Sequence, residues 1–232
     1  MSRPYRMLLA LAVTLLFFGV SFWIDSHERQ IVSQFTAPPS STLASTALAK
    51  LSIKGRAPKT GYSRDQFGGD WQHAGGCDMR DKILGRDLTN IKVRSVSDCT
   101  ILSGTLNDPY TGKIIQFTRG PSSSTAVQID HVVAIGDAWQ KGAQQLSYDE
   151  RVQLYNDPLE LLAVDGPTNE QKSDGDAATW LPPNKSFRCR YVARQIAVKI
   201  KYKLWVTQAE YDAMQHVLET CPAQVLPVVT NS

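Results

Sequence analysis

The sequence of 232 residues has little charge imbalance, few cysteines and no internal repeat. Its net charge is only +3, which excludes a histone-like polycation, so nucleic-acid binding would depend on local clusters of positive charge. Four cysteines are too few for a disulfide-built miniprotein, and the absence of any Cys-x-x-Cys pair argues against a zinc ribbon. Hydrophobic residues at 42% and charged residues at 20% are ordinary globular values, which exclude a wholly disordered, collagen-like or coiled-coil chain.

One long hydrophobic run, from Met7 to Ile24, follows Arg3 and Arg6. Its eighteen residues exceed the core of a typical signal peptide and just reach the length that crosses a bilayer. The run ends in bulky residues where a signal peptidase needs small ones. This favours a signal anchor over a cleaved signal peptide within residues 1–29, and a buried helix of the domain is the third interpretation. The basic end should stay cytoplasmic, so we expect an extracytoplasmic protein, membrane-anchored or, if the segment is cleaved, secreted.

Composition divides the rest of the chain into three parts. Residues 30–59 are rich in Ser, Thr, Ala and Pro and are typical of a flexible linker that buries little. Residues 60–222 carry the pattern of one globular domain, and residues 223–232 form a tail. We therefore expect a single folded domain, tethered through a linker to the N-terminal segment.

All four cysteines follow the hydrophobic run. An even number of cysteines in an exported domain indicates two disulfides, for which three pairings exist. We expect the pairings between sequence neighbours, Cys77 with Cys99 and Cys189 with Cys221.

Two predicted helices support the second pairing. A helix over 186–204 carries Cys189 near its start, and a capping box at 207–210 begins another helix that ends just before Cys221. A helix rises about 1.5 Å per residue, so two antiparallel helices of similar length bring both cysteines to the same end of the hairpin.

Between the cysteines the pattern alternates short strands and short helices. We expect helices over 78–86, from 147 to about 155 and from 168 onward, and strands over 100–106, 113–118, 127–133 and 159–164. The residues at 107–112 are turn formers, which makes the first two strands a hairpin.

The strand over 127–133 contains the adjacent pair Asp130 and His131 within an apolar sequence. A charge there is costly unless it is paired, so the pair needs a structural or a functional reason. A structural ion pair or a core histidine is the simpler interpretation. The functional interpretation rests on the next elements of the chain, because Asn156, the strand over 159–164 and a helix with Asn and Lys complete a ββα unit that can hold one divalent cation.

Short strings across the domain share one order with a known family. They are Gly76–Arg80, Gly85–Leu88, Asp108–Gly112, Ile129–Val133, Asp137–Trp139, Asn156–Leu161, Asn169–Asp174 and Trp180–Pro183. The segment resembles the ββα-metal core of HNH (His-Me finger) endonucleases, and most closely the bacterial subgroup that shares the C-terminal HNH domain of GmrSD-type restriction enzymes. Asn stands at the second and third signature positions, where an amide oxygen can bind a hard metal. The resemblance implies an α+β fold with this core, an added N-terminal β-hairpin region and a C-terminal helical hairpin.

The resemblance also implies roles for five residues. His131 would be the general base, and Asp130 and Asn169 would supply oxygen ligands to one Mg²⁺, Mn²⁺ or other divalent cation. Asn156 would cross-link the two strands and orient the His131 loop, and Lys172 would face a phosphate.

One difficulty concerns the Asp130–His131 pair. Adjacent strand residues point to opposite faces, so the two side chains share a site only if the strand bends there or if metal and water lie on its two sides. The apolar residues 132–134 favour continuation of the strand.

The helix over 186–204 is the candidate substrate-binding surface. It belongs to a stretch that has many cations and no acidic residue, with Arg190, Arg194 and Lys201 as the expected nucleic-acid contacts and a solvated helix face as the alternative.

The sequence thus predicts a metal-dependent endonuclease that cleaves DNA with little sequence preference, with RNA as a second candidate substrate. Its expected partners are nucleic acid and, through the N-terminal segment, a membrane, and no protein partner is predicted. Two alternatives stay open. One is an extracytoplasmic nucleic-acid-binding protein with a degenerate site, and the other is a hydrolase of a different phosphodiester.

Overall fold

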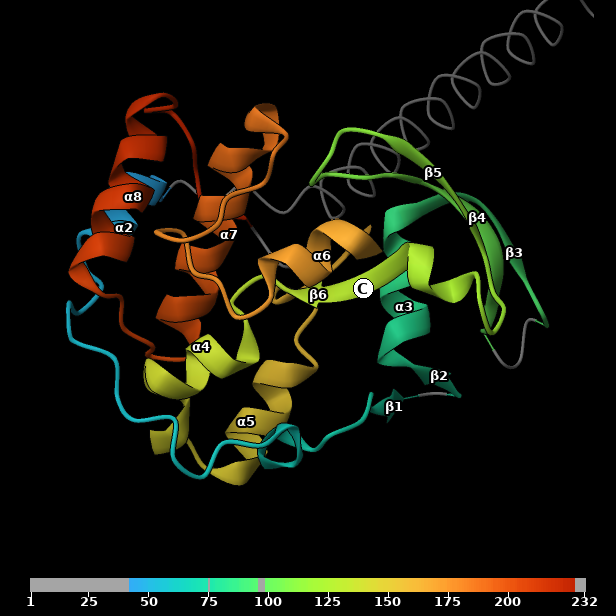
Figure 1. The fold of residues 1–232 in the computed structure, drawn as a ribbon, viewed down its shortest axis with the longest axis horizontal. Helices are drawn as coiled ribbons and strands as arrows, with labels where there is room; N and C mark the ends of the chain where they lie inside the picture. The colour runs from blue at the N-terminus through green and yellow to red at the C-terminus, as the bar shows by residue number, and fades with distance from the viewer. Residues whose placement is uncertain (1–41, 75, 96–98, 228–232) are drawn as a thin grey trace, which may run out of the picture. The chain divides into compact units, whose positions relative to one another are not determined.

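The computed structural model describes residues 42–74, 76–95 and 99–227, which form an α+β domain (Figure 1). The helices are α2 (Ala44–Leu48), η1 (Arg64–Phe67), α3 (Met79–Asp87), η2 (Ser124–Ala126), α4 (Ile135–Gln140), η3 (Ala143–Gln145), α5 (Tyr148–Tyr155), α6 (Gly166–Lys172), η4 (Lys185–Phe187), α7 (Arg188–Lys201) and α8 (Gln208–Glu219). The strands are β1 (His73–Ala74), β2 (Cys77–Asp78), β3 (Leu88–Val93), β4 (Ile101–Asn107), β5 (Ile114–Thr118), β6 (Val127–His131) and β7 (Leu161–Asp165).

The centre of the domain is the predicted ββα unit. Strands β6 and β7 pair antiparallel, with Asp130 opposite Leu162 and His131 opposite Leu161, and α6 follows β7 directly and contacts both strands. Leu162 belongs to the hydrophobic core on the helical side of the sheet, whereas Leu161 and Ala163 belong to the core on the other side. Because both faces of the two-stranded sheet are covered, β7 is a nearly continuous apolar run and does not alternate.

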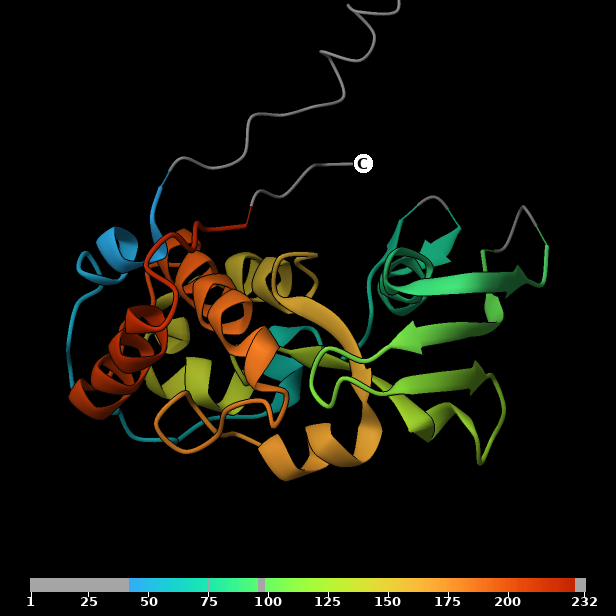
Figure 2. The same ribbon diagram turned by 90° about the horizontal axis from the view of Figure 1, so that it is seen from above.

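A second sheet lies on the side of the ββα unit away from α7 and α8. Its strands β3, β4 and β5 pair antiparallel in that order, and the sheet lies next to α3 (Figure 2). The predicted hairpin of β4 and β5 and the predicted helix α3 are confirmed. Strand β3 was not predicted, because only Leu88 of its six residues is buried and its pattern carries no alternation. The disulfide between Cys77 and Cys99 joins β2 to the residues before β4, as expected.

The C-terminal helical hairpin is also confirmed. Helices α7 and α8 pack against each other, and the Thr207 side chain caps α8 by accepting from the Glu210 N–H at 3.2 Å. The disulfide between Cys189 and Cys221 closes the end of the hairpin where both cysteines lie.

Residues 42–59 differ from the expected flexible linker. Ala44, Ala47 and Leu48 of α2 are buried in the core next to α7 and α8. Backbone bridges pair Leu43 with Val225 and Ile53 with Val206, so this segment and the start of the expected tail hold each other in place. The linker prediction is wrong for these residues, because a few small apolar side chains are enough to pack the segment into the core when backbone pairing also holds it. The predicted N-terminal segment, residues 1–29, lies outside the described residues.

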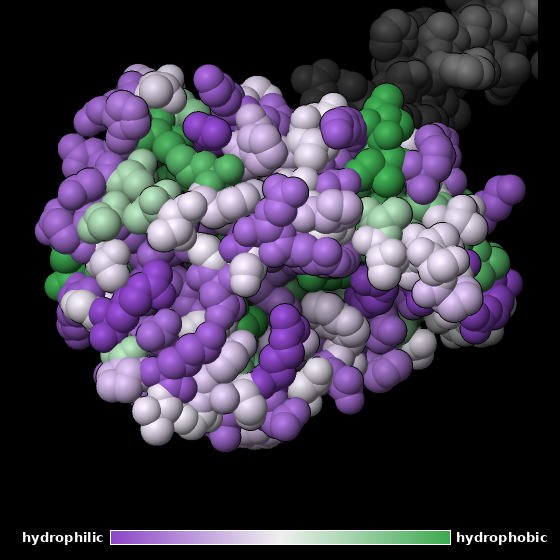
Figure 3. Space-filling view, viewed as in Figure 1, coloured by the Kyte–Doolittle hydropathy of each residue, from purple (hydrophilic) through white to green (hydrophobic). Residues whose placement is uncertain are grey.

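The face shown in Figure 3 is predominantly hydrophilic, and its hydrophobic side chains form small separate patches. Among the residues that the structure describes, no helix combines the length and the apolar character needed to cross a membrane.

The first prediction follows from the packing of α2. Leu48→Ala should lower the free energy of unfolding by about 2–5 kcal/mol, because it removes a fully buried side chain. The exposed neighbour Thr46 provides the control, since Thr46→Ala should change it by less than about 0.5 kcal/mol. Urea unfolding of both variants measures this difference, and equal stabilities would restore the linker interpretation.

Candidate active site

Strand β6 ends immediately after the Asp-His pair. The Val132 N–H still donates to the Glu160 carbonyl at 2.9 Å, but the Val133 N–H turns to the Glu160 carboxylate, with both oxygens at 3.2 Å. This side chain is fully buried, and burial raises the pKa of Glu160 well above its usual value. The expected continuation of the strand through residues 132–134 is therefore wrong, because a side chain replaces the partner strand and α4 begins at Ile135.

A cavity of about 310 Å³ lies beside β6. Asp130, His131 and Asn169 all line it, so the three residues expected to carry the chemistry do meet at one place. Asp130 and His131 can both border the cavity because they are the last two residues of the strand. Further lining residues include Tyr62, Arg64, Trp71, Gln128, Glu170 and Asp174.

His131 is held in one orientation. Its Nε2 lies 2.9 Å from the Tyr155 carbonyl oxygen, which can only accept, so Nε2 carries the proton and Nδ1 of the neutral ring has the lone pair. The ring stacks on Trp71 with an interplanar angle of 8°. Nδ1 has no hydrogen-bond partner among the described residues, and the residue lines the cavity.

The His131 ring is neutral at physiological pH. Burial, followed by the positive charges of Arg64 and Lys172, lowers the pKa of His131 to about 3, although the bond to the Tyr155 carbonyl acts in the opposite direction. The neutral form is therefore fully populated near pH 7, although the same low pKa makes the ring a weak proton acceptor.

Asp130 is held by two donors from different parts of the chain. The Tyr110 hydroxyl donates to Oδ2, and the Lys172 ammonium donates to Oδ1 at 2.8 Å and to the His131 carbonyl at 2.8 Å. Burial raises the pKa of Tyr110 well above its usual value, so its hydroxyl keeps its proton. The expectation that Lys172 faces a phosphate disagrees with this geometry, because Lys172 is buried and its ammonium is paired internally.

Tyr110 belongs to the turn between β4 and β5. Within this turn the buried Asp108 accepts from the Thr111 N–H at 2.7 Å, and its other oxygen accepts from the Asp165 N–H at 2.9 Å. Asp165 caps α6 by accepting from Thr168 N–H at 2.9 Å. One turn therefore positions both Asp130, through Tyr110, and the start of the helix that carries Asn169.

Asn169 lies on the first turns of α6, and its orientation is set by a short chain of amides. Its Nδ2 donates to Gln128 Oε1 at 2.9 Å, and Gln128 Nε2 donates to Glu170 Oε1 at 2.9 Å. The Asn169 Oδ1 atom accepts no hydrogen bond from the described residues and is free to bind a ligand.

These donors fit a hard divalent cation. A carboxylate has about four acceptor positions, of which Tyr110 and Lys172 use two on Asp130, and the Asn169 amide oxygen lines the same cavity. Asp130 and Asn169 could thus hold Mg²⁺ or Mn²⁺ and leave coordination positions open.

Asn156 lies near His131 but does not cross-link the two strands as expected. It ends α5, its Oδ1 accepts from the Gln72 N–H at 2.8 Å and its Nδ2 donates to the Val152 carbonyl at 3.0 Å. Gln72 follows Trp71, and Tyr155 precedes Asn156, so Asn156 ties together the two residues that contact the His131 ring.

Helix α7 is not the free basic surface that its composition predicts. The Arg194 guanidinium donates to the carbonyls of Pro158, Leu159 and Leu161, and burial lowers its pKa. Lys201 pairs with Asp157 at 2.6 Å. The expectation for Arg194 disagrees with the structure, because carbonyls on other elements already use its donors, whereas Lys201 pairs with one carboxylate and its side chain stays half-exposed.

Arg190 and Lys201 stay exposed, and Arg190 has no ion-pair partner among the described residues. Its guanidinium lies over the Phe187 ring at 5.2 Å.

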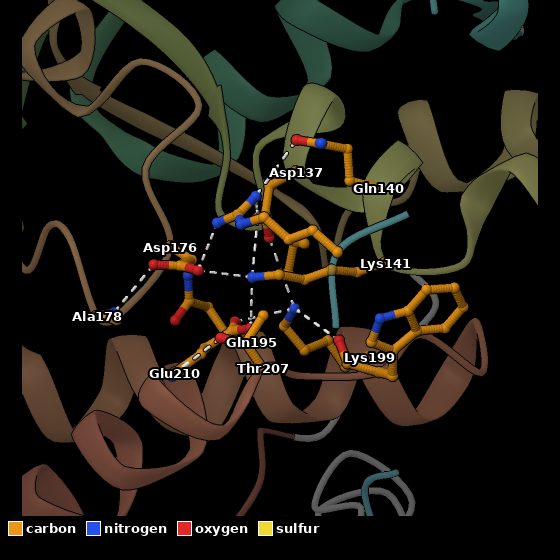
Figure 4. A network of polar contacts seen from close by, with 12 residues as sticks. Asp137, Gln140, Lys141, Asp176, Ala178, Gln195, Lys199, Thr207 and Glu210 are labelled. Atoms are coloured by element: carbon orange, nitrogen blue, oxygen red, sulfur yellow. Dashed lines mark hydrogen bonds and ion pairs between the residues drawn. The ribbon is translucent and has the colours of Figure 1, made fainter. Parts of the chain in front are cut away.

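Three buried carboxylates form a second cluster that resembles a metal site. Asp137, Asp176 and Glu210 offer oxygens within 4.8 Å of one another. Figure 4 shows the Lys141 ammonium among them, at 2.8 Å, 2.7 Å and 2.5 Å from their respective oxygens. Burial lowers the pKa of Lys141, but Glu210 and Asp137 outweigh it and the pKa lies above its usual value.

Two further cations complete this cluster. Lys199 lies 2.9 Å from Glu210, and Arg56 pairs with Asp137 at 2.7 Å and with Asp176 at 2.6 Å. Three carboxylates thus face three cations, so the cluster is already neutralised. We assign it a structural role and no metal.

Comparisons with known proteins place the chain in a family. Residues 78–217 match the family described as GmrSD restriction endonucleases, C-terminal domain, and the chain belongs to this family. A relative from Arthroderma benhamiae, named as an uncharacterized secreted protein, is 35% identical over 185 residues, which cover 79% of this chain and 87% of the relative. No solved structure matches significantly.

The second prediction follows from the contact between Tyr110 and Asp130. Tyr110→Phe should lower the free energy of unfolding by about 1–3 kcal/mol, because it leaves a buried Asp130 oxygen without its hydroxyl donor. Tyr211 is the matched control, since its hydroxyl makes no hydrogen bond to the described residues and Tyr211→Phe should have little effect. Chemical denaturation measures both, and an unchanged Tyr110→Phe variant would contradict the assigned contact.

Proposed function

We propose that this protein is an extracytoplasmic, metal-dependent endonuclease that hydrolyses phosphodiester bonds of DNA with little sequence preference, with RNA as a second candidate substrate. The observation that carries the proposal is the meeting of a neutral, oriented His131 with the oxygens of Asp130 and Asn169 around one cavity. Membership of a restriction-endonuclease domain family supports the same reaction class.

The roles of the chain's own residues follow from their contacts. His131 accepts the proton of the attacking water at Nδ1, because Nε2 is occupied by the Tyr155 carbonyl. Trp71 and Tyr155 keep the ring in place, and Asn156 holds the segments that carry them. Tyr110 and Lys172 fix the Asp130 carboxylate. A divalent cation bound by Asp130 and Asn169 would neutralise the phosphate and stabilise the leaving oxygen.

An extracytoplasmic location is supported by the two disulfides, which persist in oxidising compartments, and by the relative that is named as secreted. Anchoring through residues 1–29 stays a prediction.

One observation favours a second candidate, a nucleic-acid-binding protein without catalysis. Both Asp130 oxygens are engaged by Tyr110 and Lys172, which is the arrangement expected if the carboxylate serves only the fold. This candidate predicts DNA binding that is unaffected by EDTA and is accompanied by no cleavage.

The third prediction tests the base. His131→Ala should reduce the nicking of plasmid DNA in Mg²⁺ or Mn²⁺ by about a hundredfold or more. His131 is buried, so the variant also loses packing. Leu48→Ala is therefore the control, because it is destabilised without touching the cavity and should still cleave.

Two results would contradict the proposal in different ways. If the wild-type protein leaves plasmid DNA intact with either cation, the endonuclease function is wrong. If His131→Ala remains folded and cleaves as the wild type does, the function stands but the assignment of the base is wrong.

A further inference from the structure

The cavity beside His131 has one cationic side chain in its wall. Among the described residues that line it, Arg64 is the sole lysine or arginine. Arg64 begins η1, which precedes the region matched by the family, so this charge is supplied by a segment outside residues 78–217.

Arg64 differs from Arg86, Arg119 and Arg194 because it has neither an anionic partner nor a short hydrogen bond to the described residues. Its Nη1 lies 3.5 Å from the Tyr155 hydroxyl, and no carboxylate of the described residues lies within ion-pair distance. By contrast, Arg86 pairs with Asp87, Arg119 pairs with Asp81, and Arg194 donates to three carbonyls. Most of the five Arg64 donors are therefore available to a ligand.

The turn that carries Arg64 is held firmly although the side chain itself is exposed. Arg151 donates to the Gln66 carbonyl at 2.7 Å, and Phe67 is fully buried with its ring centroid 6.1 Å from that of Trp139. Gly68 closes the turn with φ of +92°, a conformation that favours glycine. A fixed turn limits the entropy that Arg64 loses when it binds.

Among the charged described residues that line the cavity, Arg64 is the one that attracts an anion. The carboxylates of Asp130, Glu170 and Asp174 line the cavity and repel a phosphate. Asp130 is paired with Lys172 and Asp174 is paired with Lys59, so those two ammonium groups already have partners.

We propose that Arg64 binds a phosphate of the nucleic-acid strand next to His131. The proposal rests on the proposed function and deepens it, because it assigns the substrate contact to the η1 turn where the sequence had indicated α7. A guanidinium fork donates two parallel hydrogen bonds to phosphate oxygens, which gives affinity without base preference.

The fourth prediction measures binding without catalysis. Fluorescence anisotropy of a labelled short DNA duplex in EDTA should show about tenfold weaker binding for Arg64→Gln than for the wild type. The slope of log affinity against log salt should fall by about one. Arg64→Lys should lie between the two, because it keeps the charge and loses the fork.

Lys50→Gln is the matched control, since Lys50 is exposed and does not line the cavity, and it should bind within about twofold of the wild type. Thermal unfolding confirms that each variant is folded. Wild-type affinity in Arg64→Gln, an equal loss in Lys50→Gln, or no DNA binding by the wild type would overturn the proposal.

The design separates this proposal from the proposed function. Arg64-dependent binding with no cleavage in Mn²⁺ would refute the endonuclease and leave the phosphate contact standing. Cleavage by the wild type, together with unchanged binding of Arg64→Gln, would refute the phosphate contact alone.

Discussion

The pairing of one buried carboxylate, that of Asp130, fixes the central elements of this molecule relative to one another. Asp130 lies in the centre of the ββα unit, where an unpaired charge would be costly. Tyr110 reaches it from the turn between β4 and β5, and Lys172 reaches it from the end of α6. Because the same turn also binds the Asp165 N–H at the start of α6, the sheet, the strand pair and the helix are fixed to one another. The position of Asn169 is a consequence of this arrangement.

Many of the positively charged side chains pair with carboxylates of the chain itself. A helix with many cations and no acidic residue indicates a polyanion-binding surface when it is considered alone. In the folded chain the acidic partners come from other elements, since Lys199 meets Glu210 of α8 and Lys201 meets Asp157. Arg64 is the sole lysine or arginine among the described residues that line the cavity, and it has no such partner.

The sequence predicts those features that depend on local pattern. The apolar strand that includes Leu161–Val164, the helix that begins after Ser147 and the pairing of the cysteines are confirmed. The end of β6 was not predicted, because a side-chain bond from Glu160 to the Val133 N–H depends on tertiary structure. A charged residue within the apolar run at 159–164 was the available signal.

The candidate site likewise contains residues that the local sequence pattern predicts and residues whose roles depend on tertiary structure. The motif order placed Asp130, His131 and Asn169 in one site, and all three line the cavity. Tyr110 was identified only as a turn residue, and Trp71 and Arg64 had no signal, because their roles depend on segments that meet His131 in space. Lys172 was assigned to a phosphate because nothing in the sequence reveals that Asp130 faces it.

The most direct test of the account is a titration of the protein with Mn²⁺ followed by electron paramagnetic resonance. The account predicts one bound Mn²⁺ per chain, with affinity reduced by about tenfold or more in Asn169→Ala and unchanged in the exposed neighbour variant Gln171→Ala. Absence of Mn²⁺ binding by the wild type, or equal affinity in Asn169→Ala, would contradict it.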